Sequence, residues 1–190
     1  MTVALRQRRV SALAASVGIA ALVLGSELIL FLVRAHEDRL HLGTGKARWI
    51  WATRDLPEPA PLRFEAIKEF SLSRPEGAGR ARVFVDRAYT LRVNGSLVGS
   101  GSRNPGDPLD EYDLSTRLRP GRNEIAIEAS SPTGAGGILF WLDLGGGRSV
   151  VSDASWEIQA GPEGSKRRRA VVWGRPPMYP WGYPVLPRRN

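Results

Sequence analysis

Four acidic side chains lie close together in a Gly- and Pro-rich segment at residues 100–113: Asp107, Asp110, Glu111 and Asp113. Two carboxyl groups about 5–10 Å apart, one of them with a raised pKa, can hydrolyse a glycosidic bond. Carboxylates in loops of this composition are, however, usually exposed to solvent or cap turns. The segment therefore does not favour general acid–base catalysis, and we expect that the chain is not an enzyme.

The same region carries the residue types that recognise sugars without reacting with them. A sugar site needs an aromatic ring for the C–H face of the sugar and planar polar groups for its hydroxyls. Tyr89 and Trp141 are the candidates for the ring, although core packing is the alternative for Trp141. The candidates for hydroxyl contacts are Arg87, Arg103, Asn104, Asp107 and Asp110.

The charge distribution and the composition exclude some classes of binding partner. The chain has 27 basic and 19 acidic residues and a net charge of +8, but residues 46–160 hold fifteen of each sign. The positive excess lies mainly in residues 161–190, which hold seven basic residues and one acidic residue. A nucleic-acid-binding domain normally carries such an excess on its folded surface, so we expect no nucleic-acid partner. Because the chain lacks Cys and its two His have no third ligand nearby, we also expect no metal or other cofactor.

Residues 10–33 form an apolar stretch of the length that crosses a bilayer. As a helix, this segment would be about 36 Å long. Basic residues precede it at Arg6, Arg8 and Arg9, whereas the residues that follow carry both signs. The positive-inside rule then places residues 1–9 in the cytoplasm and the C-terminal domain in the periplasm or outside the cell. A cleaved signal peptide is the alternative, although its apolar core is usually shorter, and both interpretations export the domain.

The predicted membrane span offers a possible contact for another membrane protein. Gly18 and Gly25 belong to a stripe of small residues on one helix face, which lets a second helix approach closely. Glu27 places a carboxylate in the apolar stretch at a cost of about 2–3 kcal/mol, so it needs a partner or water. The alternatives are that small residues are simply common in membrane helices and that Glu27 lies near the outer interface.

After a linker at residues 34–46, short alternating runs predict an all-β domain at residues 47–160. In residues 89–93, Tyr89, Leu91 and Val93 share one face, and Asn94-Gly95 then predicts a tight hairpin turn. Residues 137–144 are apolar on both faces, as in a central strand covered on both sides. Eight or more such strands, separated by Gly, Pro and Asn turns, indicate a β-sandwich preceded by one transmembrane helix.

An ordered set of motifs resembles the galactose-binding-like jelly-roll domain at the N-terminal side of bacterial α-L-rhamnosidases and other glycoside hydrolases. The motifs are Trp49-Ile50-Trp51, residues 64–70, residues 89–95, Asn123-Glu124-Ile125-Ala126 and Ser152-Asp153-Ala154-Ser155-Trp156. The resemblance covers residues 47–159 and extends to the Pro-Trp-Gly at 180–182. In those enzymes an (α/α)-barrel with paired acidic residues follows the domain. Residues 157–190 are too few for such a barrel, so the resemblance implies a binding domain without a catalytic one.

Two functions fit these features. The first is a membrane-anchored carbohydrate-binding module of the cell envelope that acts on surface or periplasmic polysaccharide, with a neutral oligo- or polysaccharide as ligand. The alternative is a non-enzymatic interaction subunit of a membrane complex, which would use the sandwich and the helix to bind partner proteins. The tail at residues 161–190, basic and then rich in Pro and aromatic residues, would either dock on a flat surface or wrap its own domain. In the second case, Val171, Val172 and Trp173 would add an edge strand.

Overall fold

The computed structural model describes residues 22–32, 43–54, 58–74, 79–161 and 166–187. The chain divides into two units, residues 1–40 and residues 41–190. In the first unit, residues 22–32 form a helix that carries Gly25 and Glu27, whereas Gly18 and most of the predicted span at 10–33 lie outside the described residues. Within the described part of the chain, no helix has both the length and the apolar character needed to cross a bilayer.

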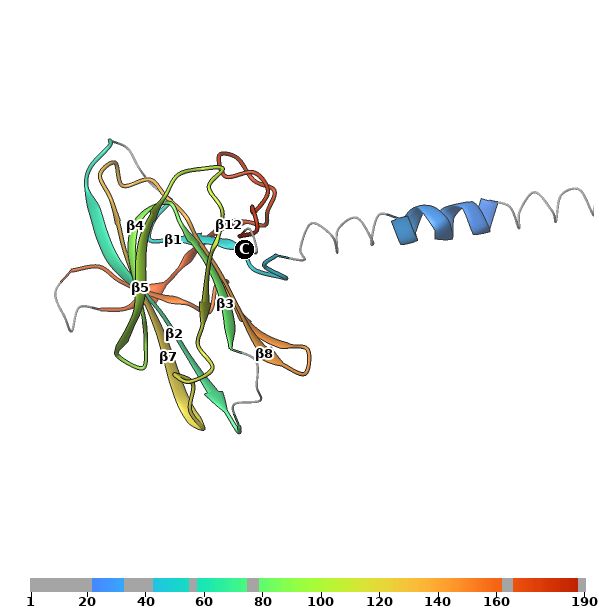
Figure 1. The fold of residues 1–190 in the computed structure, drawn as a ribbon. Helices are drawn as coiled ribbons and strands as arrows, with labels where there is room; N and C mark the ends of the chain where they lie inside the picture. Colours follow the sequence, from blue (N-terminus) through green and yellow to red (C-terminus); the bar gives the residue numbers. More distant parts are fainter. Residues whose placement is uncertain (1–21, 33–42, 55–57, 75–78, 162–165, 188–190) are drawn as a thin grey trace, which may run out of the picture. The chain divides into compact units, whose positions relative to one another are not determined.

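The second unit is a sandwich of two antiparallel sheets (Figure 1). In the first sheet the order is β12 (Val171–Gly174), β1 (Trp49–Trp51), β8 (Ile138–Gly145), β3 (Arg80–Val85) and β6 (Asp110–Asp113), and β9 (Arg148–Val151) also pairs with β8. In the second sheet it is β11 (Arg168–Arg169), β10 (Glu157–Gln159), β2 (Leu62–Leu72), β7 (Gly121–Ser131), β4 (Arg87–Val93) and β5 (Ser96–Arg103). The predicted β-sandwich is confirmed.

The main hydrophobic core lies between the two sheets, as the alternation of apolar residues predicts. Val83 of β3, Leu91 of β4 and Ile127 of β7 are all fully buried in it. Trp51 and Trp156 are also fully buried, and Trp51 meets Phe64 edge to face with 4.8 Å between ring centroids. Burial of apolar surface is worth about 25 cal/mol per Å², so the side chains of this core stabilise the packing of the two sheets.

A tight turn joins β4 to β5 at the predicted position. Asn94 and Gly95 both have positive φ, 51° and 79°, and Val93 pairs with Ser96 across the turn. Positive φ at both central residues is the geometry of a type I′ turn, which suits the right-handed twist of the two strands.

A second, smaller core covers the outer face of the first sheet. It contains Trp49, Phe84 and Leu139 from the strands, together with Trp181 from the C-terminal tail. Trp181 stacks on Trp49 with 4.3 Å between ring centroids, and β12 pairs with β1 and so forms the edge of the sheet. The prediction that the tail wraps its own domain and adds an edge strand is therefore confirmed, and the fold extends beyond residue 160.

The region expected to be one long loop at residues 100–112 is shorter than predicted. β5 continues to Arg103 and β6 begins at Asp110, so only residues 104–109 connect them. Glycines within β5 make room for two aromatic rings: a Cβ at Gly99 would lie 2.5 Å from Tyr112, and one at Gly101 would lie 2.8 Å from Tyr89. The Gly-rich composition thus reflects close packing within a strand as well as a turn.

Candidate functional site

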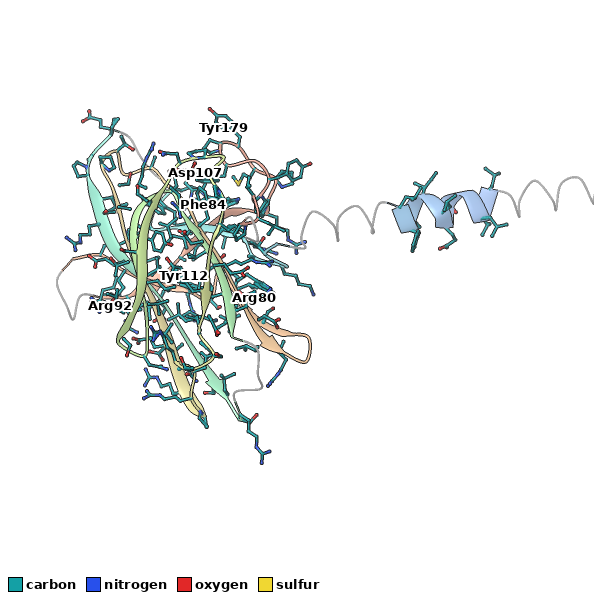
Figure 2. All side chains as sticks on the ribbon, in the orientation of Figure 1. Arg80, Phe84, Arg92, Asp107, Tyr112 and Tyr179 are labelled. Carbon is teal, nitrogen blue, oxygen red and sulfur yellow. The ribbon has the colours of Figure 1, made fainter. Side chains whose placement is uncertain are left out.

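An open groove of about 580 Å³ lies on the outer face of the first sheet, over β6, β3 and β8. Its charged and aromatic lining residues are Arg80, Arg82, Glu111, Asp113, Trp141 and Asp143. We call it the outer groove. Figure 2 labels Arg80 and Tyr112, which also lines the outer groove.

The register of three strands places these side chains in one row. Arg82 of β3 pairs with Glu111 of β6 on one side and with Trp141 of β8 on the other. Because successive residues of a strand point to opposite faces, burial of Ala81 and Val83 in the main core directs Arg82 outward. The outer groove therefore follows from strand pairing between residues that are about 30 and 60 positions apart in the sequence.

Arg82 fixes the indole ring of Trp141. Its guanidinium lies 5.2 Å from the centre of the Trp141 ring, its Nε donates to Glu111 Oε2 at 2.9 Å, and its Nη1 donates to the carbonyl of Gly43 at 2.9 Å. Only 12% of the Arg82 side chain is exposed. The turn at Gly45 contacts the Nε1 edge of the indole, since a Cβ there would lie 3.1 Å from Trp141 Nε1 and 3.2 Å from Cδ1. Trp141 is thus a partly buried ring held in a defined orientation.

Hydrogen bonds and ion pairs also orient the acidic residues of the outer groove. Glu111 bridges two cations, because its Oε1 lies 3.5 Å from Arg80 Nε while its Oε2 accepts from Arg82. Asp143 accepts from the amide of Gly145 at 2.9 Å. Asp113 accepts from the Ser115 amide at 2.8 Å, and hydrogen bonds from Ser115 hold the pKa of Asp113 below its usual range. In the described part of the chain, no three His, Asp or Glu residues are grouped so that they could hold a metal ion.

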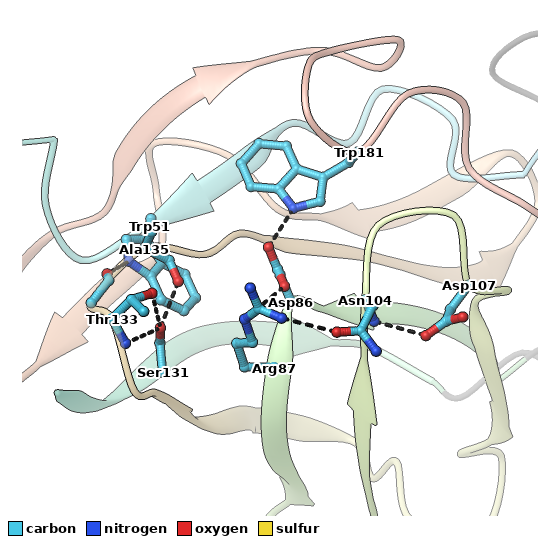
Figure 3. A network of polar contacts seen from close by, with 10 residues as sticks. Trp51, Asp86, Arg87, Asn104, Asp107, Ser131, Thr133, Ala135 and Trp181 are labelled. Carbon is cyan, nitrogen blue, oxygen red and sulfur yellow. Dashed lines mark hydrogen bonds and ion pairs between the residues drawn. The ribbon is translucent and has the colours of Figure 1, made fainter. Parts of the chain in front are cut away.

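Three of the residues predicted from the sequence form a hydrogen-bonded chain elsewhere, where β4 begins and β5 ends (Figure 3). Arg87 Nη1 donates to Asn104 Oδ1 at 2.9 Å, and the Asn104 amide donates to Asp107 Oδ2 at 2.7 Å. Arg87 has a backbone φ of 82°, a region of conformational space that residues other than glycine rarely adopt. We call these three residues the loop cluster.

Three further predicted residues contact one another and lie partly inside the domain. Tyr89 donates to Asp110 Oδ2 at 2.5 Å and lies 2.9 Å from the hydroxyl of Tyr112, and Arg103 pairs with Asp110 Oδ1. Tyr89 is only 4% exposed, and burial followed by the bond to Asp110 raises its pKa above the usual range. Tyr89 therefore offers no open ring face for a sugar, and both oxygens of Asp110 are engaged. The reason is the alternation of β4, which directs Tyr89 into the core with Leu91.

The predicted residues therefore belong to three places, and Trp141 alone lines the outer groove. The charged groove residues, none of which was predicted as a sugar contact, are Arg80, Arg82, Glu111, Asp113 and Asp143. A signal for two of them was present, because Arg80 and Arg82 alternate with Ala81 and Val83 in the sequence. Glu111, which lies opposite Arg82 on the neighbouring strand, could not be found in this way, because strand register depends on pairing between distant parts of the chain.

Comparisons with known proteins identify the fold. No protein-family model matches the sequence, and no curated protein matches it. Among solved structures, the GH78 family rhamnosidase of Bacillus sp. GL1 matches with a TM-score of 0.64 and 22% identity, over 74% of this chain and 20% of that chain. The Streptomyces avermitilis α-L-rhamnosidase complexed with L-rhamnose matches with a TM-score of 0.61 and 22% identity, over 73% of this chain and 16% of that one.

A fungal lectin is also similar. The apo Pleurotus ostreatus lectin has a TM-score of 0.61 and 27% identity, over 75% of this chain and 46% of that chain. The same lectin in complex with GalNAc matches with a TM-score of 0.56 and 26% identity. This chain thus spans about a fifth of the rhamnosidases and less than half of the lectin. The shared part is a β-sandwich, which confirms the predicted resemblance to the galactose-binding-like domain of rhamnosidases.

Proposed function

We propose that this chain is a non-catalytic carbohydrate-binding module of the cell envelope, anchored in the membrane by residues 10–33, which binds polysaccharide in the outer groove. One observation carries the proposal. The outer groove combines a fixed, partly exposed indole, Trp141, with guanidinium and carboxylate groups that are already oriented.

This combination suits the two sides of a sugar ring. The C–H face of a pyranose packs against an aromatic ring, while its hydroxyls exchange hydrogen bonds with planar charged groups such as those of Arg80 and Glu111. The volume of about 580 Å³ lies within the usual range for small-ligand sites. Two basic and three acidic side chains line the groove, so no strong charge of one sign favours a polyanion.

The ligand that fits is a neutral or mildly acidic oligosaccharide held weakly. An open groove leaves its polar groups in competition with water, and the bound sugar loses translational freedom. We expect dissociation constants of about 10 µM to 1 mM, which correspond to about 4–7 kcal/mol.

The similarity to a lectin supports binding, and the electrostatics support the absence of catalysis. The Pleurotus ostreatus lectin, whose structure in complex with GalNAc is similar to this chain at 26% identity, binds a sugar. A glycosidase needs one carboxyl group with a raised pKa as its general acid. In the outer groove, hydrogen bonds from Ser115 lower the pKa of Asp113, which is the opposite of what a general acid needs.

The test is calorimetric titration of residues 43–190 with a panel of oligosaccharides. All twelve strands and both hydrophobic cores lie within these residues. We expect Trp141→Ala to weaken binding at least tenfold, with Glu111→Gln weakening it less. Thermal unfolding should show that both variants remain folded.

The matched control is Arg87→Ala in the loop cluster, which should leave binding unchanged. If Arg87→Ala abolished binding and Trp141→Ala did not weaken it, the sugar site would be the loop cluster and not the outer groove. Absence of binding to every sugar, together with copurification of a membrane protein that depends on residues 10–33, would favour the interaction subunit instead.

A further inference from the structure

Exposed apolar side chains of the sandwich gather on one loop of the C-terminal tail. Tyr179, Tyr183, Val185 and Leu186 are 93%, 53%, 44% and 44% exposed. Among the described residues of the second unit, only Leu97 is another large hydrophobic residue of this exposure. We call these four residues the tail patch, and Figure 2 shows Tyr179 pointing away from the domain. Isolated exposed apolar residues are ordinary, whereas such a cluster marks a contact surface.

The loop that carries the tail patch is fixed to the domain. Trp181, within the loop, stacks on Trp49 and donates from Nε1 to Asp86 Oδ2 at 2.9 Å (Figure 3). The amide of Gly182 donates to the carbonyl of Met178 at 2.6 Å, which closes a turn with Tyr179 inside it. These contacts hold the backbone on both sides of Tyr179, and the carbonyl of Val185, which accepts from the amide of Leu109 at 2.8 Å, holds the backbone after Tyr183. The two tyrosines are therefore exposed on an ordered loop.

The tail patch lies beside the point where the described part of the second unit begins. Leu186 covers Gly43 so closely that a Cβ there would lie 2.7 Å from Leu186 Cδ2. Nine residues, 34–42, connect Gly43 to the predicted membrane span, and nine residues reach at most about 32 Å when fully extended. This step rests on the proposed membrane anchor: with residues 10–33 in a bilayer, the tail patch stays within reach of the same membrane surface.

The chemistry of the loop fits an interface between lipid headgroups and water. Tyrosine is enriched at this depth, where its ring meets acyl chains and its hydroxyl meets water. Within residues 171–187, Arg175 is the one charged side chain and it is exposed, whereas the neighbouring Asp86 is buried against Trp181 and Asp107 lies beside Pro108, which bridges Val185. In the sequence, Arg188 and Arg189 follow and no acidic residue follows Glu163. Basic residues close to a membrane are attracted to anionic headgroups, and apolar and basic contacts together hold a protein more firmly than either alone.

We propose that the tail patch inserts into the headgroup region of an anionic lipid bilayer and holds the sandwich against the membrane. Tyr179 and Tyr183 enter the interface, Val185 and Leu186 contact the acyl boundary, and Arg175 faces the lipid phosphates. The domain then has a second membrane attachment that does not depend on the helix.

Cosedimentation of residues 43–190 with vesicles tests the proposal, because this fragment lacks the predicted span but retains both cores. The vesicles are phosphatidylcholine alone and phosphatidylcholine with a quarter phosphatidylglycerol, at 100 mM salt. We expect binding to the anionic vesicles, and at least a fivefold smaller bound fraction for the double variant Tyr179→Ser/Tyr183→Ser. Leu97→Ser, a matched change at a residue 57% exposed on β5, should bind like the wild type.

Failure of the wild-type fragment to bind anionic vesicles even at 20 mM salt would overturn the proposal. The proposal would also be overturned if the double variant bound as well as the wild type. It would be overturned, too, if Leu97→Ser reduced the bound fraction as much as the double variant does. Both tyrosine substitutions lie outside the outer groove, so the double variant should keep any sugar affinity of the wild type. The outcome is therefore distinguishable from failure of the sugar-binding proposal.

Discussion

The side-chain amide of Asn94 donates a hydrogen bond to Oδ1 of Asn123 at 3.0 Å, and this contact ties the hairpin turn to the start of β7. Asn94 also donates to the carbonyl of Arg117 at 2.9 Å and accepts from the amide of Glu124 at 3.0 Å. One turn residue therefore sets the local backbone of the hairpin and also connects it to a segment about 30 residues away.

Asn123 is the buried partner in this network, with no exposed surface. Its Oδ1 also accepts from the amide of Arg119 at 3.0 Å, and its Nδ2 donates to the carbonyls of Arg119 and Gly121 at 2.7 and 3.1 Å. The side chain of Asn123 thus closes the turn at residues 119–123 from inside.

We expect Asn123→Ala to lower the free energy of unfolding by about 1–3 kcal/mol, because buried donors and acceptors lose their partner. Urea unfolding followed by tryptophan fluorescence measures the change. The matched control is Asn104→Ala, an exposed residue of the loop cluster, which should stay within about 0.5 kcal/mol of wild type. Equal stability of the two variants would show that the network contributes little.

The hairpin turn allows a second test of stability. Gly95 has a φ of 79° and nothing within 4 Å of the position of a Cβ, so Gly95→Val would create backbone strain without a steric clash. We expect a loss of about 1–3 kcal/mol. Ser96→Val, at the exposed first residue of β5, should be close to neutral because β-branched residues suit a strand. Equal melting temperatures for these variants would contradict the role of positive φ.

Strands and turns could be predicted from the sequence because their signals are local. Alternation around Leu91 and the Asn94-Gly95 pair depend on neighbours within a few residues, and both predictions are confirmed. Even the edge strand at Val171–Gly174 was visible as a short apolar run. Local signals suffice for such elements because one face of each strand must be buried.

The candidate site could be predicted only in part, because it depends on which strands pair. Trp141 was predicted as a sugar contact together with Arg87, but the two residues lie in different sheets. Glu111 was considered only as an acid in a loop, whereas the pairing of β6 with β3 brings it onto Arg82. Tyr89 was predicted to share a strand face with Leu91 and Val93 and also to contact a sugar, and its burial agrees with the strand pattern and not with the sugar contact.

A pH-dependent test concerns the outer face of the second sheet, where Glu65 pairs directly with Glu128 across β2 and β7. Burial, followed by the charges of Glu124 and Glu128, raises the pKa of Glu65. A raised pKa means that the folded state binds the proton more tightly than the unfolded state does. The charged form therefore lowers stability above the folded pKa, and this penalty disappears as the pH falls below the unfolded pKa.

Glu65→Gln should consequently raise the free energy of unfolding at pH 7 by about 0.2–1 kcal/mol, towards the lower end because solvent screens the charges. The difference should vanish near pH 4. Glu69→Gln is the control with opposite sign, because the hydrogen bond from Arg122 lowers the pKa of Glu69. A Glu65→Gln variant that is less stable than wild type at pH 7 would contradict the prediction.

The last prediction concerns the bond between Trp181 and Asp86, which holds the C-terminal tail on the first sheet. The carboxylate of Asp86 is buried, with 5% of the residue exposed. Its Oδ2 accepts from Trp181 Nε1, whereas its Oδ1 accepts no hydrogen bond from any described residue and lies 3.6 Å from Arg87 Nε. The indole N–H is thus a principal partner of a buried charge, and its removal leaves that charge poorly solvated.

We expect Trp181→Phe, which keeps an aromatic ring on Trp49, to cost about 1–3 kcal/mol through the lost donor. Trp181→Ala should cost about 3–5 kcal/mol because it also empties the space against Gly137, where the ring lies 2.6 Å from a Cβ position. Adding Asp86→Asn to Trp181→Phe should recover part of the loss, since a neutral amide is less costly to bury than a charge. A double-mutant cycle in urea measures this coupling, for which we expect about 1 kcal/mol or more. Strict additivity of the two substitutions would show that the hydrogen bond from Trp181 to Asp86 does not help to hold the tail.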